Sequence, residues 1–490
     1  MLFQAFKPKL SQHHHQTYLN PSRWTLLTDC SKRNLISLRF HICCELPLMS
    51  LISGGTCSIP IKKPVKLGGG GGLTTASMFL DKDSNRIGDV SCTTFNILAP
   101  IYKRLNGVKR ESDFREYWFR RNEKILIRLR DLNSSIICIQ EFWVGNEELV
   151  RMYERQLGGA GYKTYKLGRT NNRGDGLLTA VRQDHFRVLN YEELLFNDIG
   201  DRVAQLLHVE LIMNSSKNKA IKIEKEALVV NTHLMFPHNS RYCFPRLKQV
   251  YKILQYIESY GKEHQLPPLP IILCGDWNGS KRGHIFKFLR SQGFESSYDI
   301  AHDYTDSDED ACKWVSHRNH RGNICGVDFI WLYNPNSRRK PLKESFMKAV
   351  LGNIKKHLPD NGSSITYAQF LQTSSQLGLT SDPFNVVSTE EMKELWNHVD
   401  INGDGKIEYS TLDRTWNPQT FSQQKESSEE SKERGTQAIV STATTIGFKI
   451  KNAVLFPPEV EKGQWPENYV LSDHAHLTVE FSPITIQCCS

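Results

Sequence analysis

Polar residues follow several apolar segments of this chain, at the points where a buried strand should give way to a loop. Most are carboxylates and carboxamides, and two are histidines. Oxygen donors combined with imidazoles suit a hard divalent cation and a phosphate group. Cleavage of a phosphate ester would then need a positioned water, donors for the non-bridging oxygens and help for the leaving group. The positions are Asn96, Glu141, Asn231, His233, Asp276, Asn278, Asp328, Asp473 and His474.

Each of these residues alone has a simple structural explanation. A carboxylate at a strand end is more often a cap or turn residue than a ligand, and a lone histidine is usually structural. Together they are informative, because several strands deliver them to what would be one edge of the sheets, and the chain has no Gly-rich phosphate loop and no thiol nucleophile motif. Mg²⁺, or Mn²⁺ in its place, takes carboxylate and amide oxygens and retains several waters. The candidate ligands are Asn96, Glu141 and Asp473.

The segments that must position these residues alternate between short β-rich runs and longer amphipathic runs. Strands are predicted where apolar and β-branched residues cluster, as in VSCTTFNIL and PIILCGDWN. Helices are predicted over 111–132, 241–263 and 284–292. The alternation predicts an α/β fold with mixed β-sheets. Cys138 and Cys274 lie inside strand-like runs, where cysteine behaves as a small hydrophobic residue.

Composition narrows the class of protein. The chain has 490 residues, 39% of them hydrophobic and 23% charged, which excludes a wholly disordered chain or one with many membrane spans. No stretch approaches the roughly 20 uncharged apolar residues of a spanning helix. The formal charge is +9, but residues 1–88 alone carry 11 Lys and Arg against 4 Asp and Glu, so the central body is only mildly basic. This favours local contacts with phosphate over coating of nucleic acid. The 12 cysteines form no CxxC pair, so we expect reduced thiols inside a cell and no zinc site.

Changes in composition divide the chain into four parts. Residues 1–88 have few acids and five consecutive glycines, and three interpretations fit them equally: an organellar targeting segment, a disordered extension, or a start site placed too early. Residues 89–340 and 435–490 carry strand patterns and are predicted to form one domain in two parts. Between them, 341–434 is predicted to be a helical insertion without strands that ends in the low-complexity tail QQKESSEESKERG.

The insertion contains DINGDGKIEYST over 400–411, which follows the calcium-loop template of oxygen ligands at positions 1, 3 and 5 and glycine at position 6. The predicted ligands are Asp400, Asn402, Asp404 and, through its backbone carbonyl, Lys406. Thr411 replaces the twelfth-position Glu and removes a bidentate carboxylate, so we expect weak Ca²⁺ binding. Residues 353–371 have the helix, turn and helix layout without the acids. The insertion is therefore predicted to be an α-helical EF-hand pair with one degenerate half.

The ordered motifs of the chain resemble the endonuclease/exonuclease/phosphatase superfamily over about residues 90–340 and 445–483. These motifs are TTFNILAPIY, IQEFW, NTHL, CGDWN, VDFIW and SDHAHLTVEF. They look most like the branch of carbon-catabolite-repressor-type deadenylases, and an EF-hand inserted before the SDH motif is similar to a plant group described as calcium-binding. The resemblance implies a sandwich of two mixed β-sheets flanked by helices, and metal-dependent hydrolysis of phosphate esters.

The resemblance also implies a role for each matching position. The metal would be held by Asn96, Glu141 and Asp473, and the phosphate by Asn231 and His233. Asp276 would orient or deprotonate the attacking water, and Asn278 would stabilise the transition-state oxygens. His474 would contact the phosphate and be oriented by Asp328.

The chain departs from the deadenylase motif next to Asp276. Trp277 and Gly279 stand where that branch usually has Phe and Ser, and the basic loop HRNHRG precedes Asp328. Trp277 and Arg318 could therefore stack on or pair with a nucleotide, whereas a solvated loop explains them equally well. A preference for poly(A) is not carried over.

The sequence thus favours an Mg²⁺-dependent phosphodiester hydrolase, an RNA 3′–5′ exonuclease of deadenylase type that acts on RNA or another phosphate ester. Two alternatives stay open. One is a soluble phosphatase of a nucleotide or other small phosphate ester, and the other is a calcium-responsive binding protein with a vestigial catalytic body. We expect a cytoplasmic or nuclear location, with organellar targeting by residues 1–88 as the alternative. The sequence does not identify protein partners.

Overall fold

The computed structural model describes residues 88–487 apart from 106, 213–224, 238–242, 282, 308, 338, 359–363, 381–385, 401 and 409–443. The extension expected at 1–88, except Gly88, lies outside the described residues, and so does the low-complexity tail of the insertion. None of the helices in the described part of the chain is long and apolar enough to cross a membrane.

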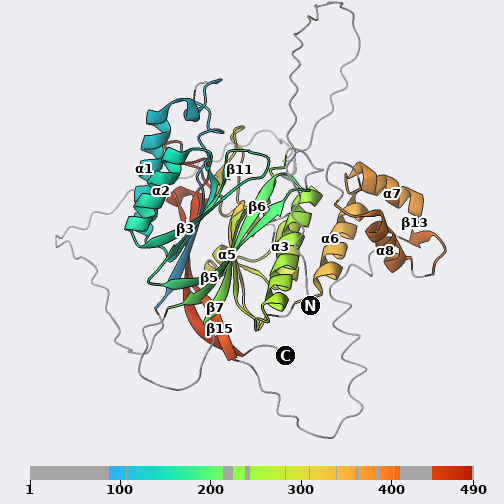
Figure 1. Ribbon diagram of the computed structural model, residues 1–490. Coiled ribbons are helices and arrows are strands. Elements are labelled where there is room, and N and C mark those ends of the chain that lie inside the picture. The colour runs from blue at the N-terminus through green and yellow to red at the C-terminus, as the bar shows by residue number, and fades with distance from the viewer. Residues whose placement is uncertain are drawn as a thin grey trace, which may run out of the picture. The chain divides into compact units, whose positions relative to one another are not determined.

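Two six-stranded β-sheets form the body of the protein (Figure 1). The strands of the first sheet are β1 (Val90–Asn96), β2 (Ile136–Phe142), β3 (Tyr162–Gly168), β4 (Gly176–Arg182), β15 (Thr444–Phe456) and β16 (His476–Gln487). Those of the second are β5 (Phe186–Phe196), β6 (Arg202–Leu211), β7 (Glu226–His233), β8 (Ile271–Asp276), β9 (Glu295–Ser296) and β12 (Asp328–Tyr333). The strand orders are β15-β16-β1-β2-β4-β3 and β5-β6-β7-β8-β12-β9. Each sheet is mixed, because it contains one parallel pair, β1 with β2 or β7 with β8.

Each parallel pair is connected by a helix, as a crossover between parallel strands requires. Helix α1 (Arg115–Leu132) connects β1 to β2, and α3 (Cys243–Glu263) connects β7 to β8. The sequence predicted both, together with α4 (His284–Ser291). Two of the boundaries differ, because 111–113 forms a separate turn of 3₁₀-helix before α1 and α4 ends at Ser291, one residue before the predicted end. Helix α1 ends at Leu132, and the next residue, Asn133, caps it with a left-handed φ of 50°.

The two sheets pack face to face, with β1 and β2 against β7, β8 and β12. Helix α1 and helix α2 (Glu147–Gly159) share a separate apolar cluster with the first sheet, in which Leu149 and Tyr153 are fully buried. On the second sheet, Phe286 of α4 packs on Trp331 of β12, with ring centroids 5.0 Å apart. The structure therefore confirms a sandwich of two mixed sheets flanked by helices.

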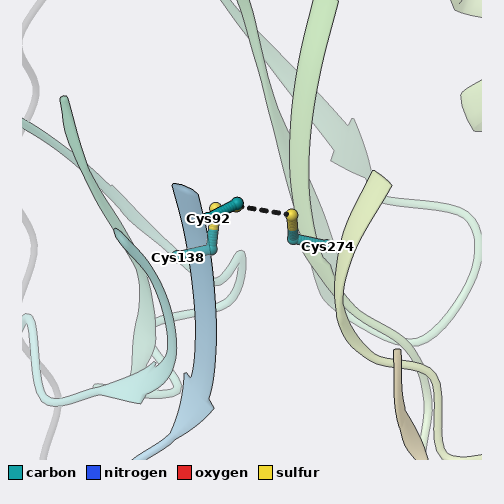
Figure 2. A group of neighbouring side chains, drawn as sticks. All are labelled: Cys92, Cys138 and Cys274. Carbon is teal, nitrogen blue, oxygen red and sulfur yellow. Dashed lines mark hydrogen bonds between the residues drawn. The ribbon is translucent and has the colours of Figure 1, made fainter. Parts of the chain in front are cut away.

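Three cysteines meet in the core between the sheets (Figure 2). They are Cys92 of β1, Cys138 of β2 and Cys274 of β8, and each is at most 1% exposed. The sulfur atoms of Cys92 and Cys274 lie 3.3 Å apart across the two sheets. The side chains take the place of small apolar residues, as the sequence predicted for Cys138 and Cys274.

The described part of the insertion forms a helical lobe with a small sheet. Its helices are α6 (Leu342–Lys356), α7 (Tyr367–Gln376) and α8 (Thr389–Val399). Two short strands, β13 (Ser364–Thr366) and β14 (Lys406–Glu408), pair through Ile365 and Ile407. This corrects the prediction that strands stop between 341 and 434, because a strand of three residues is too short to show alternation in the sequence. The ring of Phe346 in α6 packs on Tyr251 of α3, with centroids 4.4 Å apart.

After the insertion the chain returns to the first sheet. Strand β15 pairs with β16, and β16 pairs with β1, both in antiparallel ladders. Besides β9, the segment between α4 and β12 contains the short elements α5 (Ser297–Ala301), β10 (His317–Arg318) and β11 (Ile324–Cys325), and a turn of 3₁₀-helix over Asp310–Cys312. His317 of β10 forms an isolated bridge with His474, which brings this hairpin to the start of β16.

Candidate active site

One end of the second sheet carries three of the predicted residues in a row. His233 pairs with Asp276 in the ladder between β7 and β8, and Asp276 pairs with Asp328 between β8 and β12. His233 and Asp276 end their strands, whereas Asp328 begins its strand, because β12 is antiparallel to β8. Strand direction therefore brings the three side chains to one edge of the sheet.

The first sheet carries other predicted residues at one of its ends. Asn96 ends β1 and pairs with Gln140 of β2, which directly precedes Glu141. Strand β16 is antiparallel to β1 and begins at His476, so Asp473 and His474 lie just before it at the same end. Contacts between the two sheets then join the two groups of residues into one site.

Asp276 lies at the centre of this site. Its Oδ2 accepts a hydrogen bond from Asn96 Nδ2 at 3.0 Å, and lies 3.2 Å from Nε2 of His233 and 3.8 Å from Nε2 of His474. Its Oδ1 accepts the backbone N–H of Asn278 at 2.8 Å. Burial raises the pKa of Asp276, and the charge of His474 opposes this increase. A buried carboxylate with fixed partners is suited to orient a water or accept its proton.

His474 is held by Asp328. Its Nδ1 donates to Oδ2 of Asp328 at 2.9 Å, and the hydroxyl of Ser316 donates to the same oxygen at 2.7 Å. Burial lowers the pKa of His474, but the charges of Asp328 and Asp276 oppose this and the pKa rises to about 10. His474 is therefore an imidazolium at neutral pH, and it can donate a hydrogen bond to an anion.

His233 has the opposite charge state. Burial, and then the positive charge of Arg202, hold the pKa of His233 well below 6.5. Its Nε2 lies 3.0 Å from Nδ2 of Asn278, in addition to its contact with Asp276. A neutral imidazole carries one N–H, so Nε2 either donates to Asp276 or accepts from Asn278. The site thus combines one charged histidine with one neutral histidine.

Glu141 has a left-handed backbone conformation, with φ of 53°, which is uncommon for a residue with a side chain and is frequent at functional sites. Its carboxylate accepts hydrogen bonds from Nδ2 of Asn96 at 3.3 Å and from the backbone of Ala99 at 3.1 Å. Burial, followed by the charges of Asp473 and Asp175, raises the pKa of Glu141 to about 7. Glu141 and Asp473 therefore lie close enough for their charges to repel. This donor set fits a divalent cation that prefers carboxylate oxygens, such as Mg²⁺.

Asn96 makes contacts that differ from those of a metal ligand. Its Nδ2 donates to both Glu141 and Asp276, while its Oδ1 accepts the backbone N–H of Leu98 at 3.1 Å. In the structure Asn96 positions two carboxylates, and its own oxygen is used within the chain.

Asn231 lies behind the site and not in it. It is fully buried, its Oδ1 accepts a hydrogen bond from Gln140 Nε2 at 2.8 Å, and its Nδ2 donates to Thr179 at 3.1 Å. Both ends of its amide are used in joining the two sheets. This corrects the expectation that Asn231 contacts the phosphate.

Trp277 and Arg318 occupy different environments. Trp277 is 1% exposed, and its Nε1 donates to the carbonyl of Phe329 at 3.3 Å. This corrects the expectation that Trp277 stacks on a nucleotide, because protein encloses the ring. Arg318 lies at the rim of the site, where its backbone N–H donates to the carbonyl of Asp473 and its guanidinium pairs with Glu467 at 3.0 Å.

Three further residues complete the site. Asp175 directly precedes β4, accepts the hydroxyl of Tyr102 at 2.6 Å and pairs with Arg169 at 3.2 Å. Ser472 donates to the carbonyl of Asn96 at 2.7 Å and accepts the backbone N–H of His474. The ring of His317 stacks on His474, with centroids 4.1 Å apart. Sequence reasoning missed all three residues, although Asp175 in RGDGLL and Ser472 in LSDH lie at strand ends like the predicted residues.

The predicted calcium loop is described from 402 to 408, together with Asp400. Oδ2 of Asp400 accepts the backbone N–H of Gly405 at 3.1 Å, and Oδ1 of Asp404 accepts that of Lys406 at 2.8 Å. Asn402 donates to the other oxygen of Asp404. Among the described residues, Oδ1 of Asp400 is buried without a hydrogen-bond partner. Position 12 of the loop, Thr411, lies outside the described residues.

Comparison with known proteins identifies the family. A model described as the Endonuclease/Exonuclease/phosphatase family matches residues 93–346, which contain most of the site. The chain belongs to this family. An Arabidopsis thaliana protein named as an uncharacterized calcium-binding protein is 54% identical over 423 residues, which are 82% of this chain and 86% of that protein. The resemblance stated from the motifs is therefore confirmed at the level of the family and its plant calcium-binding group.

Other matches have lower sequence identity. Carbon catabolite repressor protein 4 homolog 6 of Arabidopsis thaliana is 26% identical over 189 residues, which are 37% of this chain and 24% of that protein. The human Nocturnin catalytic domain with bound sulfate is 15% identical, with a TM-score of 0.42, and the match covers 81% of this chain and 94% of that chain. This endonuclease/exonuclease/phosphatase protein thus has distant relatives named as carbon catabolite repressor protein 4 homologs, and they do not identify its substrate.

Proposed function

We propose that this protein is an Mg²⁺-dependent phosphodiester hydrolase that acts on RNA as a 3′–5′ exonuclease of deadenylase type. The observation that carries the proposal is the set of contacts around Asp276. One carboxylate oxygen is reached by Asn96, His233 and His474, and these residues come from both sheets. A scaffold has no need of such a buried set of titratable groups, whereas hydrolysis requires one.

In the proposed reaction each group has a separate task. Asp276 orients the attacking water and takes its proton, because its second oxygen is fixed by the backbone of Asn278. The His474 imidazolium, held by Asp328, donates to a non-bridging phosphate oxygen and stabilises charge that develops in the transition state. The side chain of Asn278 contacts His233 and is proposed to stabilise the transition-state oxygens together with His474.

The carboxylates of Glu141 and Asp473 are the proposed Mg²⁺ ligands. Bound Mg²⁺ would act as a Lewis acid on the phosphate. Within the chain, Asn96 keeps the carboxylate of Glu141 apart from that of Asp276 by donating to both. This separation lets one carboxylate serve the cation while the other serves the water.

A phosphatase of a nucleotide or other small phosphate ester is the second candidate. It would use the same water, histidine and carboxylate groups, so the described contacts around Asp276 fit it equally well. The third interpretation, a calcium-responsive binding protein with a vestigial body, is disfavoured by the retention of all these groups.

We also propose that residues 341–434 are an EF-hand-like insertion within a catalytic domain made of 89–340 and 435–490. The return of β15 and β16 to the sheet that contains β1 supports the insertion. The pairing of Ile365 with Ile407 supports two joined helix–loop–helix halves, and the buried, unpartnered Oδ1 of Asp400 among the described residues supports a cation there. A cytoplasmic or nuclear location is proposed, with organellar targeting by residues 1–88 as the alternative.

A substrate panel tests the catalytic proposal. The protein is incubated with Mg²⁺, and separately with Mn²⁺, and offered oligo(A), mixed RNA, single-stranded DNA and small phosphate monoesters. Shortening of RNA from its 3′ end supports the first candidate. Release of phosphate from monoesters alone supports the second. Absence of turnover on every substrate would leave only the binding-protein interpretation.

A further inference from the structure

Arg202 lies beside the site, although neither the motifs nor the mechanism above assign it a task. It is the first residue of β6, which is antiparallel to β7 and pairs Ala204 with Thr232. His233 follows Thr232 and pairs with Asp276 of β8. The start of β6 is therefore at the end of the second sheet that carries the catalytic residues.

Two nitrogens of the Arg202 guanidinium are buried and have no hydrogen-bond partner among the described residues. The residue is 8% exposed, and within the described chain its Nε and Nη1 have no hydrogen-bond partner and no carboxylate oxygen lies within ion-pair distance. A buried charge without partners costs several kcal/mol of folding free energy or more. Such a charge costs stability unless a ligand pairs with it. Its position beside the active site therefore suggests that a ligand is its partner.

The charges near Arg202 identify what kind of ligand would fit. Burial and the charge of Arg169 lower the pKa of Arg202 to about 10, against the opposite effect of Asp175, Glu141 and Asp276. Arg202 therefore stays protonated at neutral pH. Its charge is attracted by Asp175, Glu141 and Asp276, and Glu141 is one of the proposed metal ligands. Asp175, one of these acids, already pairs with Tyr102 and Arg169 and makes no ion pair with Arg202 in the described part of the chain.

We propose that Arg202 binds a phosphoryl oxygen of the substrate, so that it acts as a third cationic group beside His474 and the proposed Mg²⁺. The inference rests on the proposed function and adds to it a substrate-positioning residue on β6. The N–H groups of Nε and Nη1 in Arg202 have no partner among the described residues, and they lie at the end of the sheet where the phosphate must sit. A phosphate oxygen can therefore be their partner. An arginine cannot exchange protons here, so its task is to hold and stabilise negative charge.

The test uses the full-length protein and three variants. Arg202→Met removes the charge and keeps most of the apolar volume, and Arg202→Lys keeps the charge without the fork of N–H donors. Arg187→Met is the control, since Arg187 lies on the neighbouring strand and makes a surface ion pair with Glu210. Binding of inorganic phosphate in the presence of Mg²⁺ is measured by calorimetry, thermal unfolding by calorimetric scanning, and kcat/KM on the best substrate of the panel.

We expect Arg202→Met to weaken phosphate binding about 10-fold or more and to lower kcat/KM on the order of 10²-fold, with Arg202→Lys intermediate. Its Tm should be unchanged or higher, because an unsatisfied buried charge is removed. Its affinity for Mg²⁺ should also rise, because a positive charge near Glu141 is lost. Arg187→Met should match the wild type in phosphate binding, Tm, kcat/KM and, when Mg²⁺ is titrated by calorimetry, Mg²⁺ affinity.

Wild-type phosphate affinity in Arg202→Met or, if that variant does not fold, in Arg202→Lys would overturn the inference. A lower Tm with unchanged phosphate binding would also overturn it, by showing that Arg202 has only a structural role. If the wild type cleaves no substrate but its phosphate binding requires Arg202, the inference stands and the catalytic proposal fails. Absence of phosphate binding by the wild type defeats the inference, whatever the substrate panel shows.

Discussion

Nδ1 of His474 donates a hydrogen bond to Oδ2 of Asp328 at 2.9 Å, although the two residues are 146 positions apart in the chain. Antiparallel pairing of β12 with β8 brings Asp328 beside Asp276, and the β10 hairpin bridges to His474. The pair fixes both the orientation and the charge of His474. Because the helical lobe of α6, α7 and α8 lies between these two residues in the chain, correct folding around this lobe is a condition for the proposed chemistry.

Removal of the charge of Asp328 should shift the pH dependence of activity. In Asp328→Asn the largest cause that raises the pKa of His474 is lost, so this pKa falls from about 10 and the imidazolium is lost at a lower pH. The alkaline limb of the pH profile of kcat/KM should therefore move to lower pH, with activity at pH 8 reduced about 10²-fold or more. NMR titration of the histidine and a pH profile measure the two effects. An alkaline limb at its original position would show that loss of the His474 imidazolium does not limit activity at high pH.

Asp276→Ala and His474→Ala should each abolish turnover and leave the fold intact. Their side chains act on the water and the phosphate, so loss of either should cost on the order of 10²-fold or more in kcat. The buried carboxylate of Asp276 has a raised pKa, so its removal should not lower the Tm. Asp184→Ala and His264→Ala, at exposed positions, are the matched controls. Near-normal rates in either site variant would reject its assignment.

The sequence predicted the strands that build the site, because each of their ends carries a polar residue after an apolar run. It could not predict that Trp277 faces inward, since its packing against Trp331 of β12 is a contact between segments that are distant in the chain. It also missed Arg202, because a charged residue at the start of a strand has the composition of a surface position. The partner of each histidine depends on strand order, for which the sequence gives no local signal.

Substitution of Glu141 should act on the metal more than on the water. Glu141→Gln should raise the Mg²⁺ concentration needed for half-maximal activity about 10-fold or more, while saturating Mg²⁺ restores part of the rate. Glu147→Gln, with an exposed carboxylate, is the control. Titration of activity against Mg²⁺ measures the effect. An unchanged Mg²⁺ requirement would show that Glu141 does not bind the metal.

The same carboxylate predicts a pH effect on the metal-free protein. The folded pKa of Glu141 is about 7 against 4.5 in an unfolded chain, so its contribution is present below about pH 4.5 and is lost as the pH rises to about 7. Mg²⁺ should restore this stability above pH 7 and should release a proton on binding below it. Urea unfolding with and without Mg²⁺ at pH 5.5 and 7.5 measures the effect. A stabilisation by Mg²⁺ that does not increase with pH would contradict it.

His476 should make the fold sensitive to acid without involving the proposed metal. Burial, and then the charge of Arg128, lower its pKa to about 3, while Arg128 donates to its Nε2 at 3.1 Å. The folded pKa lies below the unfolded value of 6.5, so stability is intact above pH 6.5 and is lost as the pH falls toward 3, by about 1.4 kcal/mol per pH unit. His476→Gln keeps an acceptor for Arg128 and should reduce this slope in urea unfolding between pH 7.5 and 5.5. A slope equal to that of the wild type would place the acid sensitivity elsewhere.

Calcium binding by the 400–411 loop should be weak. Asp400 and Asp404 are held by backbone N–H groups of the loop, and Oδ1 of Asp400 is buried without a partner among the described residues, so part of the coordination shell is formed. Thr411 offers at most one neutral oxygen where a bidentate carboxylate normally closes the shell, so the Kd should be about 10⁻⁴ M or weaker. Calorimetry on the full-length protein with Mg²⁺ present measures Kd for the wild type, for Thr411→Glu, which should bind at least 10-fold more tightly, and for Asp400→Ala, which should not bind. Micromolar binding by the unmodified loop, or no gain in Thr411→Glu, would show that the twelfth position does not limit affinity here.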